Sequence, residues 1–206
     1  AVAKYHALLK KRKATLVAKR LFDIVMASIL IILLMPVFML IAGAIFAFDG
    51  NDVIFKQQRI TKDYKAFTIY KFRTMKKDID IKNKVTSKHD ARITPIGKYL
   101  RKTRLDELPQ LFNVLKGEMS FVGTRPEVPE YVKLYDNEML ATLLLPAGIT
   151  SFASIEYKNE AELLNGVNID DIYINKILPE KMKINLKYLN DISILQDIKI
   201  MLKTII

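Results

Sequence analysis

Two adjacent carboxylates are the sharpest candidates for chemistry in this chain. Asp106 and Glu107 end the segment RKTRLDE, in which three cations precede them. Nearby cations keep a carboxylate ionised, so that it can act as a nucleophile or bind a metal. Such a site suits phosphoryl transfer, which depends on charge neutralisation and in-line positioning. The same residues also fit an ordinary helix start, with Asp106 as N-cap and Pro109 tolerated in the first turn, and local sequence leaves both interpretations open.

Other basic residues are candidates for binding phosphate, although each also fits a surface cation or an ion pair. They are Lys71 and Arg73 in KFRTM, Arg92, Arg101, and Arg125 before Pro126. The chain has no cysteine and only two histidines, and its seven glycines form neither a phosphate-binding loop nor a dinucleotide fingerprint. A phosphate enzyme built from this sequence would therefore use Arg, Lys, Asp, Glu and a hard divalent cation.

The positive charge is concentrated at the beginning of the chain. The 206 residues include 33 basic and 22 acidic ones, and the first 20 residues contain seven cations and no acid. A basic stretch next to an apolar segment is typical of contact with anionic lipid headgroups, at roughly 1 kcal/mol per cation. A solvated tail is the plain alternative. Nucleic acid is the weakest candidate partner, because a nucleic-acid binder spreads its basic residues over a folded face.

An uncharged run from Ile24 to Phe48 follows the basic segment. As a straight helix it would be about 37 Å long, enough to cross a hydrocarbon core of ~30 Å. Pro36 interrupts it, and both flanks are basic, which favours two cytoplasmic ends. We therefore expect residues 1–20 to be a basic juxtamembrane segment and 21–48 a re-entrant helix, broken at Pro36, in one leaflet. Residues 49–206 would form a cytoplasmic catalytic domain. A spanning helix is the alternative.

The remaining patterns predict an α+β, mostly α, single catalytic domain with a short β-hairpin and interfacial amphipathic helices. Residues 76–91 read as a surface loop or a lid over a site. The expected strands are Val53–Ile60, Ala66–Phe72, Phe121-Val122 and Ile149–Ile155, and the expected helices are Pro95–Lys102, Leu108–Lys116 with Gly117 as its stop, 128–145, and an amphipathic helix over 189–205.

From about Ala18 to its end, the chain resembles the monotopic phosphoglycosyl transferases, bacterial sugar transferases that initiate glycan assembly on a polyprenol carrier. The resemblance runs through KRLFDIVMA, VIFKQQR, KFRTM, AGIT and a long central block. Within that block, DELPQLFNVLKGEMSFVG is highly specific.

The resemblance implies a reaction at the cytoplasmic face of the bacterial inner membrane. Asp106 would attack the β-phosphate of a UDP-sugar, release UMP and hold a covalent phosphosugar, which a polyprenol phosphate then takes. Mg²⁺ would be the cofactor with Asp106 as a ligand, and Glu107 would orient the site or help with a proton. The implied substrate-binding residues are Lys71, Arg73, Arg92, Arg101, Arg125 and Pro126.

Three departures from the family pattern stand out. Met35 precedes Pro36 where the family often has Ser, Thr124 begins the usual Pro-Arg-Pro element, and residues 146–151 read PAGITS in place of Arg-Pro-Gly-x-Thr-Gly. The lost arginine of the last motif could alter the preference for nucleotide or sugar. A non-catalytic, membrane-anchored module that binds UDP-sugar or acts as a scaffold is the alternative function. The sequence leaves open which sugar is used and whether the chain forms a homodimer.

Overall fold

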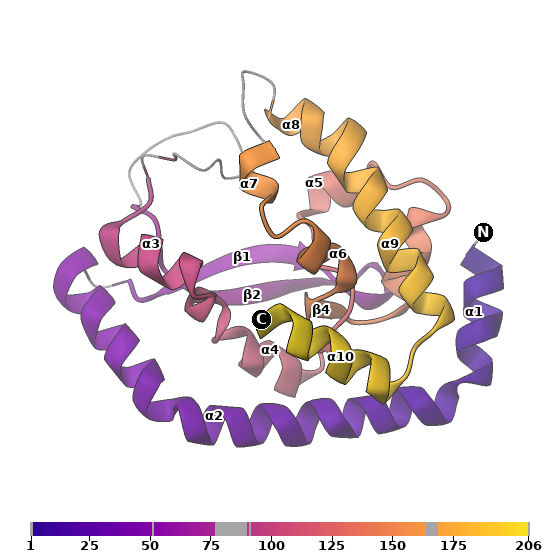
Figure 1. Ribbon diagram of the computed structural model, residues 1–206, viewed down its shortest axis with the longest axis horizontal. Helices are drawn as coiled ribbons and strands as arrows, with labels where there is room; N and C mark the ends of the chain where they lie inside the picture. The colour runs from indigo at the N-terminus through magenta and orange to yellow at the C-terminus, as the bar shows by residue number, and fades with distance from the viewer. Residues whose placement is uncertain (1, 51, 77–89, 91, 164–168, 206) are drawn as a thin grey trace.

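One very long helix borders the molecule. The computed structural model describes residues 2–50, 52–76, 90, 92–163 and 169–205. Helix α1 (Val2–Lys11) leads into α2 (Lys13–Asp49), which runs along one side of the other elements and turns toward them near its end (Figure 1). By length and composition α2 could cross a membrane, and only 17% of its most apolar window is buried. Its outer face is therefore an apolar surface.

The structure does not confirm the break expected at Pro36. The proline lies inside α2, and the helix is continuous on both sides of it. Proline removes one backbone hydrogen bond and favours a kink, but a helix can bend without ending. The turn of α2 in Figure 1 is such a change of direction within one continuous helix.

Three charged side chains near the beginning of α2 attach it to different elements of the domain. Lys19 Nζ lies 2.5 Å from Asp197 Oδ2, and both side chains are buried. Arg20 donates to the carbonyl oxygens of Val114 and Leu115 at 2.6 and 2.8 Å. About one helical turn later, the carboxylate of Asp23 accepts a hydrogen bond from the backbone N–H of Phe121, in a buried strand. At the other end, Thr94 Oγ1 donates to Asp49 at 2.7 Å.

The N-terminal hairpin is confirmed. Strands β1 (Ile54–Ile60) and β2 (Ala66–Phe72) pair antiparallel, with Ile54 opposite Phe72. Helix α3 (Pro95–Lys102) also has the predicted bounds, because Thr94 caps its first turn and Pro95 fits there. Most of the predicted loop 76–91 lies outside the described residues.

Helix α4 (Gln110–Lys116) begins two residues later than predicted and stops at Gly117, whose φ of +84° suits a residue without a side chain. Asp106 does not cap this helix. It lies instead in a short 3₁₀ turn, η2 (Leu105–Glu107), between α3 and α4.

A second, parallel sheet pairs β3 (Met119–Val122) with β4 (Ala147–Thr150). Beyond the pairing, the two backbones nearly touch: a Cβ atom on Gly148 would lie 2.1 Å from the nitrogen of Gly123. The strand predicted at Ile149–Ile155 ends at Thr150, because the Ser151 side chain accepts from the Ser154 N–H and starts α6 (Phe152–Glu156).

The second half of the domain is helical but more divided than predicted. The expected helix over 128–145 is two short pieces, α5 (Pro129–Val132) and the 3₁₀ helix η3 (Met139–Leu144). Two further short helices, α7 (Glu160–Leu163) and α8 (Ile169–Ile172), precede a π-helical turn, η4 (Tyr173–Ile177). The amphipathic helix expected over 189–205 begins later, as α10 (Ile194–Ile205). Leu189 belongs instead to the end of a preceding helix, α9 (Leu178–Asn190), which was not predicted from sequence.

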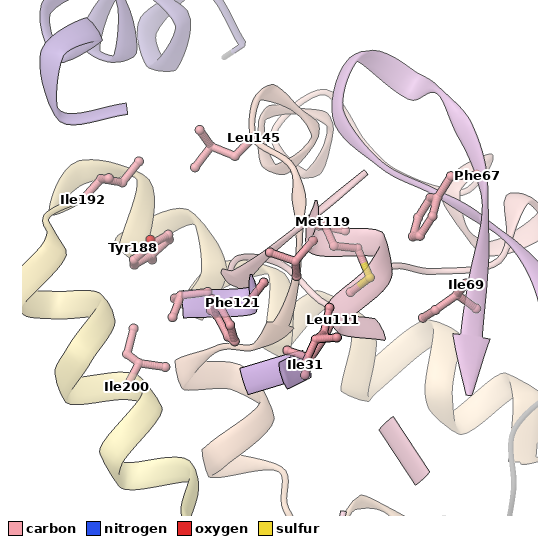
Figure 2. Packing of buried hydrophobic residues seen from close by; sticks show 14 of the residues in the cluster. Ile31, Phe67, Ile69, Leu111, Met119, Phe121, Leu145, Tyr188, Ile192 and Ile200 are labelled. Atoms are coloured by element: carbon pink, nitrogen blue, oxygen red, sulfur yellow. The ribbon is translucent and has the colours of Figure 1, made fainter. Parts of the chain in front are cut away.

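One apolar core joins α2 to the other elements. Ile31 of α2 packs with Leu111 of α4, Phe121 of β3 and Ile200 of α10 (Figure 2). A smaller cluster joins Ile60 of β1 and Tyr131 of α5 to the buried residues of η4 and to Leu178 and Met182 of α9. The long helix is therefore part of the folded domain.

Candidate active site

The carboxylate pair lies on a sharp turn between two helices. Arg104, two residues after the end of α3, has a φ of +60°, a left-handed conformation that is uncommon for a residue with a side chain. The 3₁₀ turn that follows buries both Asp106 and Glu107. Strained backbone of this kind is found where a functional side chain must be aimed, and here it precedes the pair by two residues.

Glu107 is the anion at the centre of a buried charge cluster. Its Oε1 accepts from Lys71 Nζ of β2 at 2.8 Å and from Arg125 at 2.7 Å. Burial alone would raise the pKa of Glu107, but Arg125 and Lys71 together hold it well below its ordinary value. The same ion pair raises the pKa of Arg125. Glu107 is thus held as a carboxylate that orients two cations.

Asp106 has a different environment. It is 7% exposed, and among the described residues no hydrogen bond or ion pair holds its carboxylate. Burial and the neighbouring charge of Glu107 raise its pKa, against the opposing effect of Lys71, Arg101 and Arg125. A buried carboxylate near three cations, but bound to none of them, is chemically available.

Arg101 and Arg125 approach the pair from different elements. Arg101 comes from the last turn of α3, and burial lowers the pKa of its guanidinium while the charge of Asp106 opposes that effect. Arg125 follows β3 on a loop held by the Gly123–Gly148 contact. Pro126 steadies the same loop, because its carbonyl accepts a hydrogen bond from Arg59 at 3.0 Å.

A cavity of about 560 Å³ opens beside these groups. Glu107, Arg101 and Arg125 line it, whereas Asp106 is outside the lining. The lining is rich in cations and leucines; it comprises Leu30, Leu34, Arg101, Lys102, Arg104, Glu107, Leu108, Leu111, Phe121, Arg125, Ile149, Thr150, Ser154, Ile155, Lys158, Asn159, Lys203 and Thr204. A polyanion with an apolar part would match this combination of side chains.

The structure therefore brings together five of the residues named from sequence and separates two. Lys71, Arg101, Arg125 and the Asp106–Glu107 pair share one region. Arg73 pairs with Asp52 at 3.3 Å and Arg92 with Asp90 at 2.6 Å, and neither lines the cavity. Pro126 acts through the backbone of its loop.

Sequence reasoning missed several of the residues that line the cavity. Lys158, Lys203, Leu30 and Leu34 line it, and no local motif marks them. Arg104, in contrast, could have been identified from sequence, because it belongs to the cationic stretch that directly precedes the carboxylate pair.

A metal held by protein alone does not fit these residues. The described part of the chain contains no group of three or more His, Cys, Asp or Glu side chains that could bind one. Mg²⁺, however, usually keeps several waters and binds one or two carboxylates together with substrate phosphates. The unpaired carboxylate of Asp106 fits that role once a diphosphate is present.

Comparisons with known proteins show the family of the chain. Residues 14–206 match the model of the family described as "Bacterial sugar transferase". The chain is 38% identical to "Galactosyl transferase CpsE" of Streptococcus agalactiae, over 92% of this chain and 42% of that protein. It is 37% identical to the "UDP-glucose:undecaprenyl-phosphate glucose-1-phosphate transferase" of Klebsiella pneumoniae, over 92% and 40%.

A shorter relative is covered more fully. The "Exopolysaccharide production protein ExoY" of Rhizobium meliloti is 35% identical over 76% of both chains. The chain spans about two fifths of the length of the first two relatives. The match nevertheless covers nearly all of the sequence described above, including the carboxylate pair, and the chain belongs to the bacterial sugar transferase family.

Proposed function

We propose that this chain is a phosphoglycosyl transferase that moves a sugar-1-phosphate from a UDP-sugar to a polyprenol phosphate. The observation that carries the proposal is the unpaired, buried carboxylate of Asp106 beside the Lys71–Glu107–Arg125 cluster, at the edge of a cationic cavity. The names of relatives that act on undecaprenyl phosphate support the same reaction.

In the first step, a carboxylate oxygen of Asp106 attacks the β-phosphorus of the donor. A bond from oxygen to phosphorus forms, the bond from that phosphorus to the oxygen of UMP breaks, and UMP leaves with the electron pair. Arg125 and Arg101 would bind the diphosphate oxygens and stabilise the charge that develops there. Glu107 keeps Arg125 and Lys71 in place for this contact.

In the second step, a phosphate oxygen of the acceptor attacks the same phosphorus and Asp106 leaves as a carboxylate. The bond between the sugar carbon and its oxygen stays intact, so the anomeric configuration is retained. A covalent intermediate lets a water-soluble donor and a lipid acceptor use the same phosphorus in turn. Mg²⁺, held by Asp106 and diphosphate oxygens, would supply charge neutralisation.

A re-entrant position of α2 at the cytoplasmic face of the inner membrane completes the proposal. Both ends of the helix contact the same domain: Lys19 pairs with Asp197, and Asp49 accepts from Thr94. Two ends fixed to one domain are easily accommodated on one side of a bilayer, whereas a spanning helix would separate them.

Release of UMP tests the reaction. Purified full-length chain with Mg²⁺ and a polyprenol phosphate should release UMP from at least one member of a panel of UDP-sugars. Asp106→Asn keeps the size of the side chain and removes the nucleophile, so it should reduce release by at least about a thousandfold while the thermal unfolding midpoint stays near that of the wild type. Wild-type release by this variant would refute the assignment of Asp106, and binding without release by the wild type would favour the scaffold alternative.

A further inference from the structure

The lining of the cavity combines two chemically different sets of side chains. The first set is charged and contains Glu107, and its Arg101 and Arg125 serve the donor diphosphate in the proposed reaction. The second set, called the second wall below, comprises leucines of α2 and cations of α10 and of the segment after α6. A UDP-sugar is polar over most of its length and gains less from leucine contacts than an isoprenoid chain does.

Leu30 and Leu34 form the α2 part of the second wall. They are four residues apart and therefore lie on the same face of the helix, and both are half-buried. Leu33, between them in sequence, points away from the domain and is 67% exposed. The apolar lining of the cavity is thus continuous, around one helix, with the apolar outer surface of α2.

Cations line the cavity as well. Lys203 comes from the end of α10, Lys158 follows α6, Lys102 ends α3, and Arg104 lies between α3 and the carboxylate pair. Helix α10 packs against α2, β3 and β4, and Leu195 and Leu202 on its outside are 73% and 56% exposed. Lys203 therefore lies between an exposed apolar face and the cavity, where a phosphate on a lipid chain would meet it.

We infer that the second wall is the acceptor subsite: the first isoprenoid units of the carrier lie against Leu30 and Leu34, and Lys203 binds the acceptor phosphate. This inference rests on the proposed function. It assigns the carrier an entrance from the side of α2, so that the phosphate reaches the cavity while the rest of the chain stays in the lipid. Charge complementarity selects a phosphate, and the continuity of the leucine surface selects an isoprenoid phosphate over a soluble one.

Substitution of neighbouring leucines tests the apolar part. Leu34→Ser should raise the KM for a long polyprenol phosphate about tenfold, because it removes most of one leucine contact with the chain. The KM for the UDP-sugar and the kcat at saturating acceptor should stay within about twofold of the wild type. Leu33→Ser is the matched control, since it makes the same change on the lipid-facing side and should leave both KM values unchanged.

Chain length separates this role from a general effect on folding. With a short isoprenoid phosphate, the difference in KM between Leu34→Ser and the wild type should shrink, because less chain reaches the wall. An equal loss with short and long acceptors, or equal effects of Leu33→Ser and Leu34→Ser, would overturn the subsite.

The phosphate contact has its own matched pair. Lys203→Ala should raise the KM for the acceptor about tenfold without changing that for the donor, whereas Lys187→Ala, at an exposed lysine of α9 outside the cavity lining, should change neither. Equal acceptor KM values for Lys203→Ala and its control variant would overturn the role of Lys203, and so would a change in the donor KM alone. A wild-type chain that releases no UMP with any donor would instead refute the proposed function itself.

Discussion

A single oxygen atom organises the charged groups of the site. Glu107 Oε1 accepts from both Lys71 and Arg125, so one carboxylate fixes a strand of the hairpin and the loop after β3 relative to each other. Charge-assisted hydrogen bonds of this kind are among the strongest in proteins. Glu107 is for this reason a positioning residue as well as part of the electrostatics around Asp106.

Removal of this charge should destabilise the fold. Glu107→Gln leaves two cations facing each other, and we expect a loss of about 2 kcal/mol at neutral pH. That value is below the loss for a fully buried pair because the Arg125 side chain is 33% exposed. Urea unfolding would measure the loss, with the exposed Glu156→Gln as the control. A stability equal to that of the wild type would contradict the structural role.

The same variant should respond differently to acid. The folded pKa of Glu107 lies below its unfolded value, so its contribution is fully present above the ordinary glutamate pKa of about 4.3. It is lost as the pH falls through that value toward the folded pKa. The stability gap between wild type and Glu107→Gln should therefore narrow below about pH 4. If the difference in unfolding free energy between wild type and Glu107→Gln stayed constant with pH, the charge of Glu107 would contribute nothing to stability.

At the scale of elements, the beginning of α2 acts as an anchor rather than a tail. Arg20 donates to the last carbonyls of α4, the helix that follows the carboxylate pair, and Gly117 leaves room for its guanidinium. Basic residues before an apolar run suggest lipid headgroups, yet Lys19 and Arg20 both contact protein. The exposed cations of this region, such as Lys13, remain candidates for lipid contact.

Arg20 and Lys13 should therefore differ on substitution. Arg20→Ala removes two charge-assisted hydrogen bonds and should destabilise the domain by about 2 kcal/mol, measured by thermal unfolding in detergent. Arg20→Lys should restore only part of the loss, because an ammonium cannot reproduce the forked geometry. Lys13→Ala should leave stability unchanged. If the two alanine variants behaved alike, the anchor would have no energetic role.

An element could be predicted from sequence where the residues that define it are close together in the chain. Helix α3 and the end of α4 were predictable because Thr94, Pro95 and Gly117 act within one turn. The break between α9 and α10 was not predictable, because it accompanies the burial of Ile192 against distant core residues. The carboxylate pair was identifiable from its local motif, whereas Leu34 and Lys203 join the cavity only through tertiary packing.

At the scale of the whole molecule, α2 is both a membrane element and a wall of the core. Its inner face contributes Ile31 and Phe38 to the buried cluster, and its outer face is open. In the proposed arrangement, a domain attached along one side of such a helix would lie at the depth of the lipid headgroups. The cavity would then be within reach of both the proposed soluble donor and the proposed lipid acceptor.

Labelling of single cysteines can test the topology cleanly, because the chain contains none. Lys10→Cys before α2 and Lys62→Cys after it both replace exposed lysines. In a re-entrant arrangement a membrane-impermeant maleimide should modify both positions in inverted vesicles and neither in intact cells. Labelling of the two positions from opposite sides would mean that α2 spans the bilayer.

The anchor of α2 also has a consequence for how the protein is made. Lys19 and Asp197 are 178 residues apart, so their contact forms only after that length of chain has been synthesised. The apolar run leaves the ribosome long before then and must find lipid while its polar partners do not yet exist. Biogenesis would thus proceed from a helix already resting in the leaflet, onto which the nascent domain closes as α10 emerges.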